Sequence, residues 1–173
     1  MPDYERLPAR DGAGLIHVVV ETPRGARAKF KYDRTLKVFA FSRTLALGLA
    51  YPFDWGFIPS TRGEDGDPLD VMILHDATTA PGMLVTCRPI GILNVMQSEP
   101  GKKNRRNDRI FAVPAEEGHQ AHWRDLHDVH DGLKDELQRF FVASVALQQK
   151  DLRFLGWGDA AEASASIDAH LEG

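Results

Sequence analysis

The sequence predicts a mainly β fold of the α+β class, in which a barrel-like sheet carries helices from the C-terminal third. The first two thirds of the chain hold short β-branched and aromatic runs separated by Gly and Pro, which is typical of a sandwich or a small closed barrel. The last third changes to helical spacing, with apolar residues at Leu133, Leu137, Phe140 and Phe141. The length of 173 residues fits a single domain over 1–173.

The expected strands follow one another at short intervals. Ile16–Val20 is β-branched, the turn-forming stretch Thr22–Gly25 follows it, and Ala26–Tyr32 alternates between two faces. We therefore expect the two runs to form a hairpin. Further strands are predicted at Lys37–Phe41, Val71–Leu74, Met83–Arg88, Ile90–Met96 and Arg109–Val113.

Two helices are expected after these strands. The first is predicted over about Asp131 to Gln149, to within about three residues at each end, and the second over roughly Asp159 to His170. Asp159 followed three residues later by Glu162 is a variant of the capping box, which favours a helix start there.

The composition indicates which partners the protein binds and in which compartment it is located. Lys and Arg number 21 against 25 Asp and Glu, and the net charge of −4 argues against nucleic acid or a membrane surface as partner. No apolar run approaches the roughly 20 residues that span a bilayer, and the N-terminus is polar. The single cysteine, Cys87, cannot form an intrachain disulfide and is expected in a core strand. These features indicate a cytoplasmic protein.

An acidic turn is the most informative segment. Asp65, Asp67 and Asp70 occur within six residues, with Gly66 and Pro68 between them, so they lie in a tight loop before a strand. Clustered carboxylates repel one another unless a proton, solvent or a cation separates them, and carboxylate oxygen is a ligand that Mg²⁺ and Mn²⁺ prefer. The spacing does not fit a calcium EF-hand loop. The alternative is a solvated acidic turn that leads into a strand.

Basic residues precede this turn. Lys29 and Lys31 share one face of their strand, Arg24 lies in the turn before it, and Arg43 follows the next strand. Beside a metal cluster, such cations would bind phosphoryl oxygens. Taken singly, each is better explained as a solvated surface residue.

Longer blocks connect these features. They are Glu21–Gly25 with Lys29 and Arg43, Tyr51–Pro59, Glu64–Asp70, Pro81–Gly82, Arg88–Gly91, Ala112–Pro114, Phe140–Phe141 and Gly156–Trp157. In order and approximate spacing, this series resembles the family I soluble inorganic pyrophosphatases over nearly the whole chain.

The resemblance implies an OB-like five-stranded barrel with flanking helices, a cytoplasmic homohexamer, and hydrolysis of pyrophosphate to two phosphates with Mg²⁺, or with Mn²⁺ in its place. It implies that Asp65 and Asp70 hold metal ions, that Asp67 lies at the metals and accepts a proton from the attacking water, and that Glu21 contributes to an outer metal site. Lys29 and Arg43 would bind phosphate oxygens.

The chain departs from the family pattern at several of these positions. The family has Glu at Lys31, Tyr at Trp55, Asp at Gln97 and Asn107, Lys at Arg109, and Tyr-Lys at Ser144-Val145, and its loop before Arg109 is shorter. Lys31 and Arg109 are therefore additional candidate phosphate ligands, Asn107 a weaker metal ligand through its amide oxygen, and Asp108 and Glu99 candidate substitute ligands. The loop Lys102–Arg109 adds further cations.

Three readings of function remain open. We favour an active phosphoanhydride hydrolase with altered efficiency or specificity, since the acidic turn and its basic partners are retained. The second is an impaired homologue that binds phosphate, a nucleotide or a protein. The third, which the net charge disfavours, is an OB-type binder of single-stranded nucleic acid. His119, His122, His127 and His130 lack a metal-binding spacing and are expected at the surface near a helix start.

Overall fold

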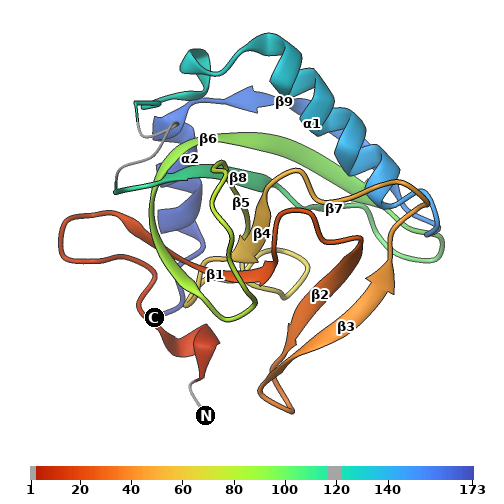
Figure 1. Cartoon of the computed structure of the whole chain (residues 1–173), viewed down its shortest axis with the longest axis horizontal. Coiled ribbons are helices and arrows are strands. Elements are labelled where there is room, and N and C mark those ends of the chain that lie inside the picture. Colours follow the sequence, from red (N-terminus) through yellow and green to blue (C-terminus); the bar gives the residue numbers. More distant parts are fainter. Residues whose placement is uncertain (1–2, 117–121) are drawn as a thin grey trace.

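Five strands close into a barrel in the computed structural model, which describes residues 3–116 and 122–173 (Figure 1). β1 pairs with both β4 and β6, and this double pairing closes the ring. β5 and β8 are parallel, and the other neighbours are antiparallel. The predicted OB-like barrel is thus confirmed. In ring order the strands are β1 (Ile16–Thr22), β4 (Asp54–Phe57), β5 (Asp70–Ile73), β8 (Arg109–Pro114) and β6 (Leu84–Ser98).

Four further strands extend this barrel or stand beside it. β2 (Ala28–Asp33) and β3 (Val38–Thr44) form a separate hairpin, which projects from the barrel in Figure 1. β7 (Arg105–Arg106) and β9 (Asp151–Gly158) both pair with β6. The prediction of a hairpin between β1 and β2 is wrong, because β4 and β6 occupy the two edges of β1 and β2 pairs with β3.

The long strand β6 differs from the prediction in a second way. The sequence predicted two strands here, separated at Pro89, whereas the structure has one strand with a register shift between Pro89 and Gly91. Pro cannot donate to the ladder, and a bulge accommodates it without ending the strand. Gly91 is needed there because a Cβ atom would lie 2.0 Å from the Leu126 side chain. β4, β7 and β9 were not predicted.

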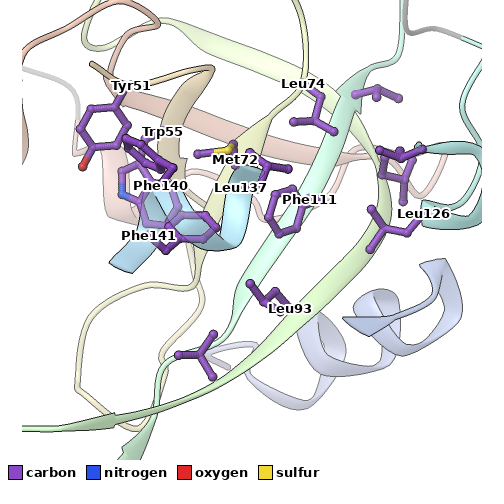
Figure 2. Close-up of a cluster of buried hydrophobic side chains, with 14 of the residues drawn as sticks. Tyr51, Trp55, Met72, Leu74, Leu93, Phe111, Leu126, Leu137, Phe140 and Phe141 are labelled. Atoms are coloured by element: carbon purple, nitrogen blue, oxygen red, sulfur yellow. The ribbon is translucent and has the colours of Figure 1, made fainter. Parts of the chain in front are cut away.

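Alternate residues of the barrel strands belong to two apolar clusters. On β5, Met72 belongs to the first cluster, while Val71 and Ile73 belong to the second. Phe140 and Phe141 join the first cluster, where Figure 2 shows them next to Tyr51 and Trp55. The second cluster contains Cys87, which is fully buried on β6 as expected, together with Ala163 and Ile167.

The helices begin at side-chain caps. His130 accepts from Gly132 N at the start of α1 (Asp131–Ser144), and His122, His127 and His130 are exposed, whereas His119 lies outside the described residues. The Asp159–Glu162 capping box is present at the start of α2 (Ala160–Ala169), which confirms that prediction. Two short 3₁₀ helices cover Tyr4–Arg6 and Leu126–Asp128. None of the described helices is long and apolar enough to span a bilayer.

Helix α1 ends five residues before its predicted end. The last residue of the helix is Ser144, and turns follow up to Gln149. The final carbonyls of a helix lack partners within it. Arg43 Nη1 donates to Ser144 O over 2.6 Å, so the β2–β3 hairpin supplies one such partner. This contact joins α1 to the basic residues described below.

Candidate active site

The acidic turn lies between β4 and β5 and is held by its own backbone. Gly63 N donates to Asp67 O over 2.8 Å, and Asp67 N donates to Asp65 Oδ1 over 3.0 Å. Gly66 has a φ of +84°, a conformation that favours glycine and allows the chain to turn between the aspartates. Asp70 is the first residue of β5, so the sheet fixes the end of the turn. The local sequence therefore gathers the carboxylates, as predicted.

Five carboxylates of the described residues line one cavity of about 140 Å³, which we call the carboxylate cavity. Glu21 reaches it from β1, and its Oε1 accepts from Tyr32 N over 2.7 Å. Glu21 is 5% exposed, and burial raises the pKa of its carboxyl to about 7. Burial likewise raises the pKa of Asp70. Glu5, Asp65 and Asp67 complete the set.

A second cavity of about 170 Å³ adjoins the first and shares six lining residues with it. We call it the basic cavity, because five of the described residues that line it are basic and one, Asp70, is a carboxylate. Tyr51, Trp55, Phe140 and Phe141 form its apolar part. The two cavities therefore place an acidic region beside a cationic one. The basic residues are Lys29, Lys31, Arg43, Arg109 and Lys150.

The β2–β3 hairpin supplies three of these cations. Lys29 is paired with Arg43 in register across the two strands, and Lys29 and Lys31 both line the two cavities, as their shared face predicted. Burial lowers the pKa of Lys29, while Asp70 and Glu21 oppose that shift. Lys31 Nζ lies 2.6 Å from Asp67 Oδ2, and Arg34 Nη2 lies 3.2 Å from Asp67 Oδ1.

Arg109 enters the site from β8. Because β5 and β8 are parallel with Asp70 opposite Arg109, Arg109 Nη1 lies 3.3 Å from Asp70 Oδ2. Its guanidinium carbon lies 5.4 Å from the Trp55 ring centroid and 5.7 Å from that of Phe141. Within the described part of the chain, Arg109 Nε and Trp55 Nε1 are buried donors that have no hydrogen-bond acceptor. This side of the site is thus rich in donors.

Two amides stand where the resemblance leads one to expect carboxylates. Asn107 Nδ2 donates to Gln97 Oε1 over 3.0 Å, and Gln97 Nε2 donates to Glu99 Oε1 over 3.1 Å. These two hydrogen bonds orient both amide groups. Neither of them uses the amide oxygen of Asn107. Both Gln97 and Asn107 line the two cavities.

Neither candidate substitute ligand lines either cavity. Asp108 accepts from Val95 N over 2.8 Å and from two nitrogens of Arg106 at 3.0 and 2.9 Å, so its carboxylate is already engaged. Hydrogen bonds from Lys102 and Lys150 lower the pKa of Glu99 to about 2. A metal role for Asp108 stays a prediction.

The carboxylate cavity offers oxygen atoms that are potential ligands of divalent cations. Over residues 3–116 and 122–173, no three His, Cys, Asp or Glu side chains converge closely enough to count as a metal cluster. Asp65 and Asp70 nevertheless line the carboxylate cavity together with Asn107, and all three offer the hard oxygen atoms that Mg²⁺ prefers. The pKa values of Asp70 and Glu21 are raised by desolvation, so a nearby cation would stabilise the charged form of both carboxyls. The oxygen donors of these residues therefore suit a divalent cation chemically, while the described side chains do not converge on one point.

Sequence reasoning missed several residues of this site. Gln97 and Asn107 were recognised as replacements, but their mutual hydrogen bond was not foreseen. Lys150 and Arg34 were missed, since neither belongs to a motif and each reaches the site through the tertiary structure.

Comparison with known proteins agrees with this arrangement. A family model described as inorganic pyrophosphatase matches residues 18–173. Among similar sequences, the inorganic pyrophosphatase of Nostoc sp. is 35% identical over 170 residues, covering 98% of both chains, and that of Thermus thermophilus is 37% identical over 173 residues, covering 98% of this chain and 96% of the relative.

Solved structures give the same result. The crystal structure of inorganic pyrophosphatase from Thermus thermophilus superimposes with a TM-score of 0.89 at 35% identity, covering 98% of this chain and 97% of the other. The crystal structure of an inorganic pyrophosphatase from Neisseria gonorrhoeae superimposes with a TM-score of 0.82 at 30% identity, covering 95% of this chain and 94% of the other. With a family match over most of its length and relatives above 30% identity, the chain belongs to the inorganic pyrophosphatase family.

Proposed function

We propose that the chain hydrolyses inorganic pyrophosphate to two phosphate ions with the help of divalent cations, Mg²⁺ or Mn²⁺. The observation that carries this proposal is the adjacency of the carboxylate cavity and the basic cavity, which share Lys29, Lys31 and Asp70. Phosphoryl transfer depends mainly on positioning and on neutralising charge. Membership of the pyrophosphatase family supports the choice of substrate.

Each group of residues has a role in this proposal. Asp65, Asp70 and the amide oxygen of Asn107 would hold the cations, with Glu21 contributing at their edge. When bound, divalent cations lower the pKa of water and neutralise phosphate oxygens. Asp67 would accept the proton of the attacking water at a carboxylate oxygen.

The cations on the other side orient the substrate. Arg109 and Arg43 are held by Asp70 and by the end of α1, which fixes two guanidinium groups at the basic cavity. Lys29 and Lys31 lie between the two cavities. These four side chains would bind the phosphate oxygens and keep the P–O–P bridge beside the acidic turn.

The test is phosphate release from pyrophosphate across a titration with Mg²⁺ or Mn²⁺. Asp67→Asn is expected to slow release by a factor on the order of 10² to 10⁴, as for loss of a general base. Asp168→Asn is the matched control, since Asp168 also pairs with an arginine, at 2.9 Å from Arg10, but lies outside both cavities. Equal rates for wild type and Asp67→Asn would reject the role of Asp67, and release without any divalent cation would reject the metal dependence.

A second candidate function is supported by the same contacts. Asp67 is bound by two cations, and the Gln97–Asn107 amide pair replaces two carboxylates, which suits a homologue that binds phosphate without turnover. Phosphate binding with no release at any metal concentration would favour this alternative.

The assembly and the location belong to the proposal as well. A homohexamer would give light-scattering masses of about six times the 19.3 kDa chain, and a monomer would contradict it. A cytoplasmic location is supported by the single, buried Cys87.

A further inference from the structure

Lys150 is a cation of the site that no motif indicated. It lies in the turn between α1 and β9, directly before the first residue of β9. Because β9 pairs with the end of β6, where Asp151 is opposite Ser98 and Leu152 is opposite Gln97, Lys150 is brought to the strand end that carries Gln97. Its side chain lines both the basic and the carboxylate cavity.

A carboxylate outside the cavities anchors this lysine. Lys150 Nζ lies 3.1 Å from Glu99 Oε1, and the Glu99 side chain is only 10% exposed. An ammonium group has three donors, so this ion pair leaves others for a ligand. The Lys150 side chain is 32% exposed, which makes it accessible while its end is held.

Three of the other four cations of the basic cavity have an ion-pair or hydrogen-bond partner that itself lines one of the cavities. Lys31 is paired with Asp67, Arg109 with Asp70, and Arg43 with the carbonyl of Ser144. Lys150 differs from them because its anionic partner does not line either cavity. The neighbouring end of α1 contributes only uncharged side chains, from Ser144, Val145 and Gln148. Lys150 therefore adds a second positive charge on this side, beside that of Arg43.

We propose that Lys150 binds a phosphate group of the substrate, held in place by its ion pair with Glu99. This inference rests on the proposed function, because it assigns a further ligand to the same diphosphate. The ammonium group of Lys150 would donate charge-assisted hydrogen bonds to oxygen atoms of this phosphate group.

The chain offers a matched control for this proposal. Lys102 Nζ lies 2.5 Å from Glu99 Oε2, so it shares the anionic partner of Lys150, yet it is 59% exposed and lines neither cavity. Removing either lysine deprives Glu99 of one cation. A loss specific to Lys150 thus reports contact with the ligand, whereas an equal loss in both variants reports disturbance of the loop.

The experiment is calorimetric binding of methylenediphosphonate, an analogue that resists hydrolysis, in the presence of Mg²⁺. Lys150→Met is expected to weaken binding roughly tenfold, Lys150→Arg to retain most of the affinity, and Lys102→Met to stay within about twofold of wild type. Unfolding temperatures of the variants establish that each is folded. Unchanged binding by Lys150→Met, or equal weakening by Lys102→Met, would overturn the inference.

The two proposals fail differently. If the wild type binds the analogue and releases phosphate from pyrophosphate while Lys150→Met binds normally, only the role of Lys150 is lost. If the wild type neither binds the analogue nor releases phosphate, the proposed function is lost and the role of Lys150 with it.

Discussion

The ammonium nitrogen of Lys31 lies 2.6 Å from Asp67 Oδ2, so the central carboxylate of the acidic turn already forms an ion pair with a side chain of the protein. Both side chains are partly exposed, at 47% and 39%. A divalent cation that approaches Asp67 therefore meets a competing positive charge. Lys31 also lines both cavities, so its charge acts on any ion bound there.

We predict from this contact that Lys31→Gln binds Mn²⁺ more tightly than the wild type. The gain is expected to be roughly fivefold, because exposed ion pairs are worth up to about 1 kcal/mol. Titration of free Mn²⁺ by electron paramagnetic resonance measures this affinity directly. Lys37→Gln is the control, since Lys37 has the same 47% exposure and pairs with Asp3 at 3.6 Å, away from both cavities. Equal affinities in Lys31→Gln and wild type would show that Lys31 does not compete with the metal.

The buried carboxyl of Glu21 predicts a pH dependence of stability in the metal-free protein. Burial raises its pKa from an ordinary 4.5 to about 7. Between these values the folded chain keeps a proton that the unfolded chain releases, so the free energy of unfolding falls as the pH rises. This difference between the two pKa values corresponds to a loss of about 3 kcal/mol in the free energy of unfolding. The loss is complete above about pH 7 and absent below about pH 4.5.

Urea unfolding at several pH values checks this expectation. Glu21→Gln should match the wild type at acid pH and exceed it by up to about 3 kcal/mol at pH 8, because Gln can still accept from Tyr32 N without carrying a charge. Glu136→Gln, at an exposed position of α1, should leave the pH profile unchanged. Parallel pH profiles of Glu21→Gln and wild type would contradict the prediction.

Local sequence signals predicted much of the fold and of the acidic turn. The alternating strands, the Asp159–Glu162 cap and the turn around Gly66 depend on residues a few positions apart, and all three are present. The hairpin between β1 and β2 was wrong because strand partners are chosen by the whole sheet. β4 was missed since its four residues lie in a block rich in Gly and Pro.

The contacts that shape the site join distant parts of the chain. Lys31 and Asp67 are 36 positions apart, and Lys150 meets Glu99 only because β9 pairs with β6. No local pattern encodes such pairs. Residue types therefore indicated the chemistry, but not which carboxylate is already paired with a cation.

A buried polar network behind the site gives the last prediction. Asp54, at the start of β4, is fully buried. Its Oδ1 accepts from Arg24 N over 2.8 Å, and its Oδ2 lies 2.6 Å from His75 Nε2 and 2.7 Å from Thr79 Oγ1. Asp54 thus joins the turn after β1 to the segment that follows β5, with three donors around one carboxylate.

We expect Asp54→Ala to lower the free energy of unfolding by about 3 to 5 kcal/mol, because it removes three hydrogen bonds and leaves the buried His75 ring without its partner. Thr79→Val removes only one donor and keeps the acceptor, so it should cost about 1 kcal/mol. Urea denaturation of the two variants and the wild type at the same pH gives both values. If Asp54→Ala were no less stable than Thr79→Val, Asp54 would not be the residue that holds these two segments together.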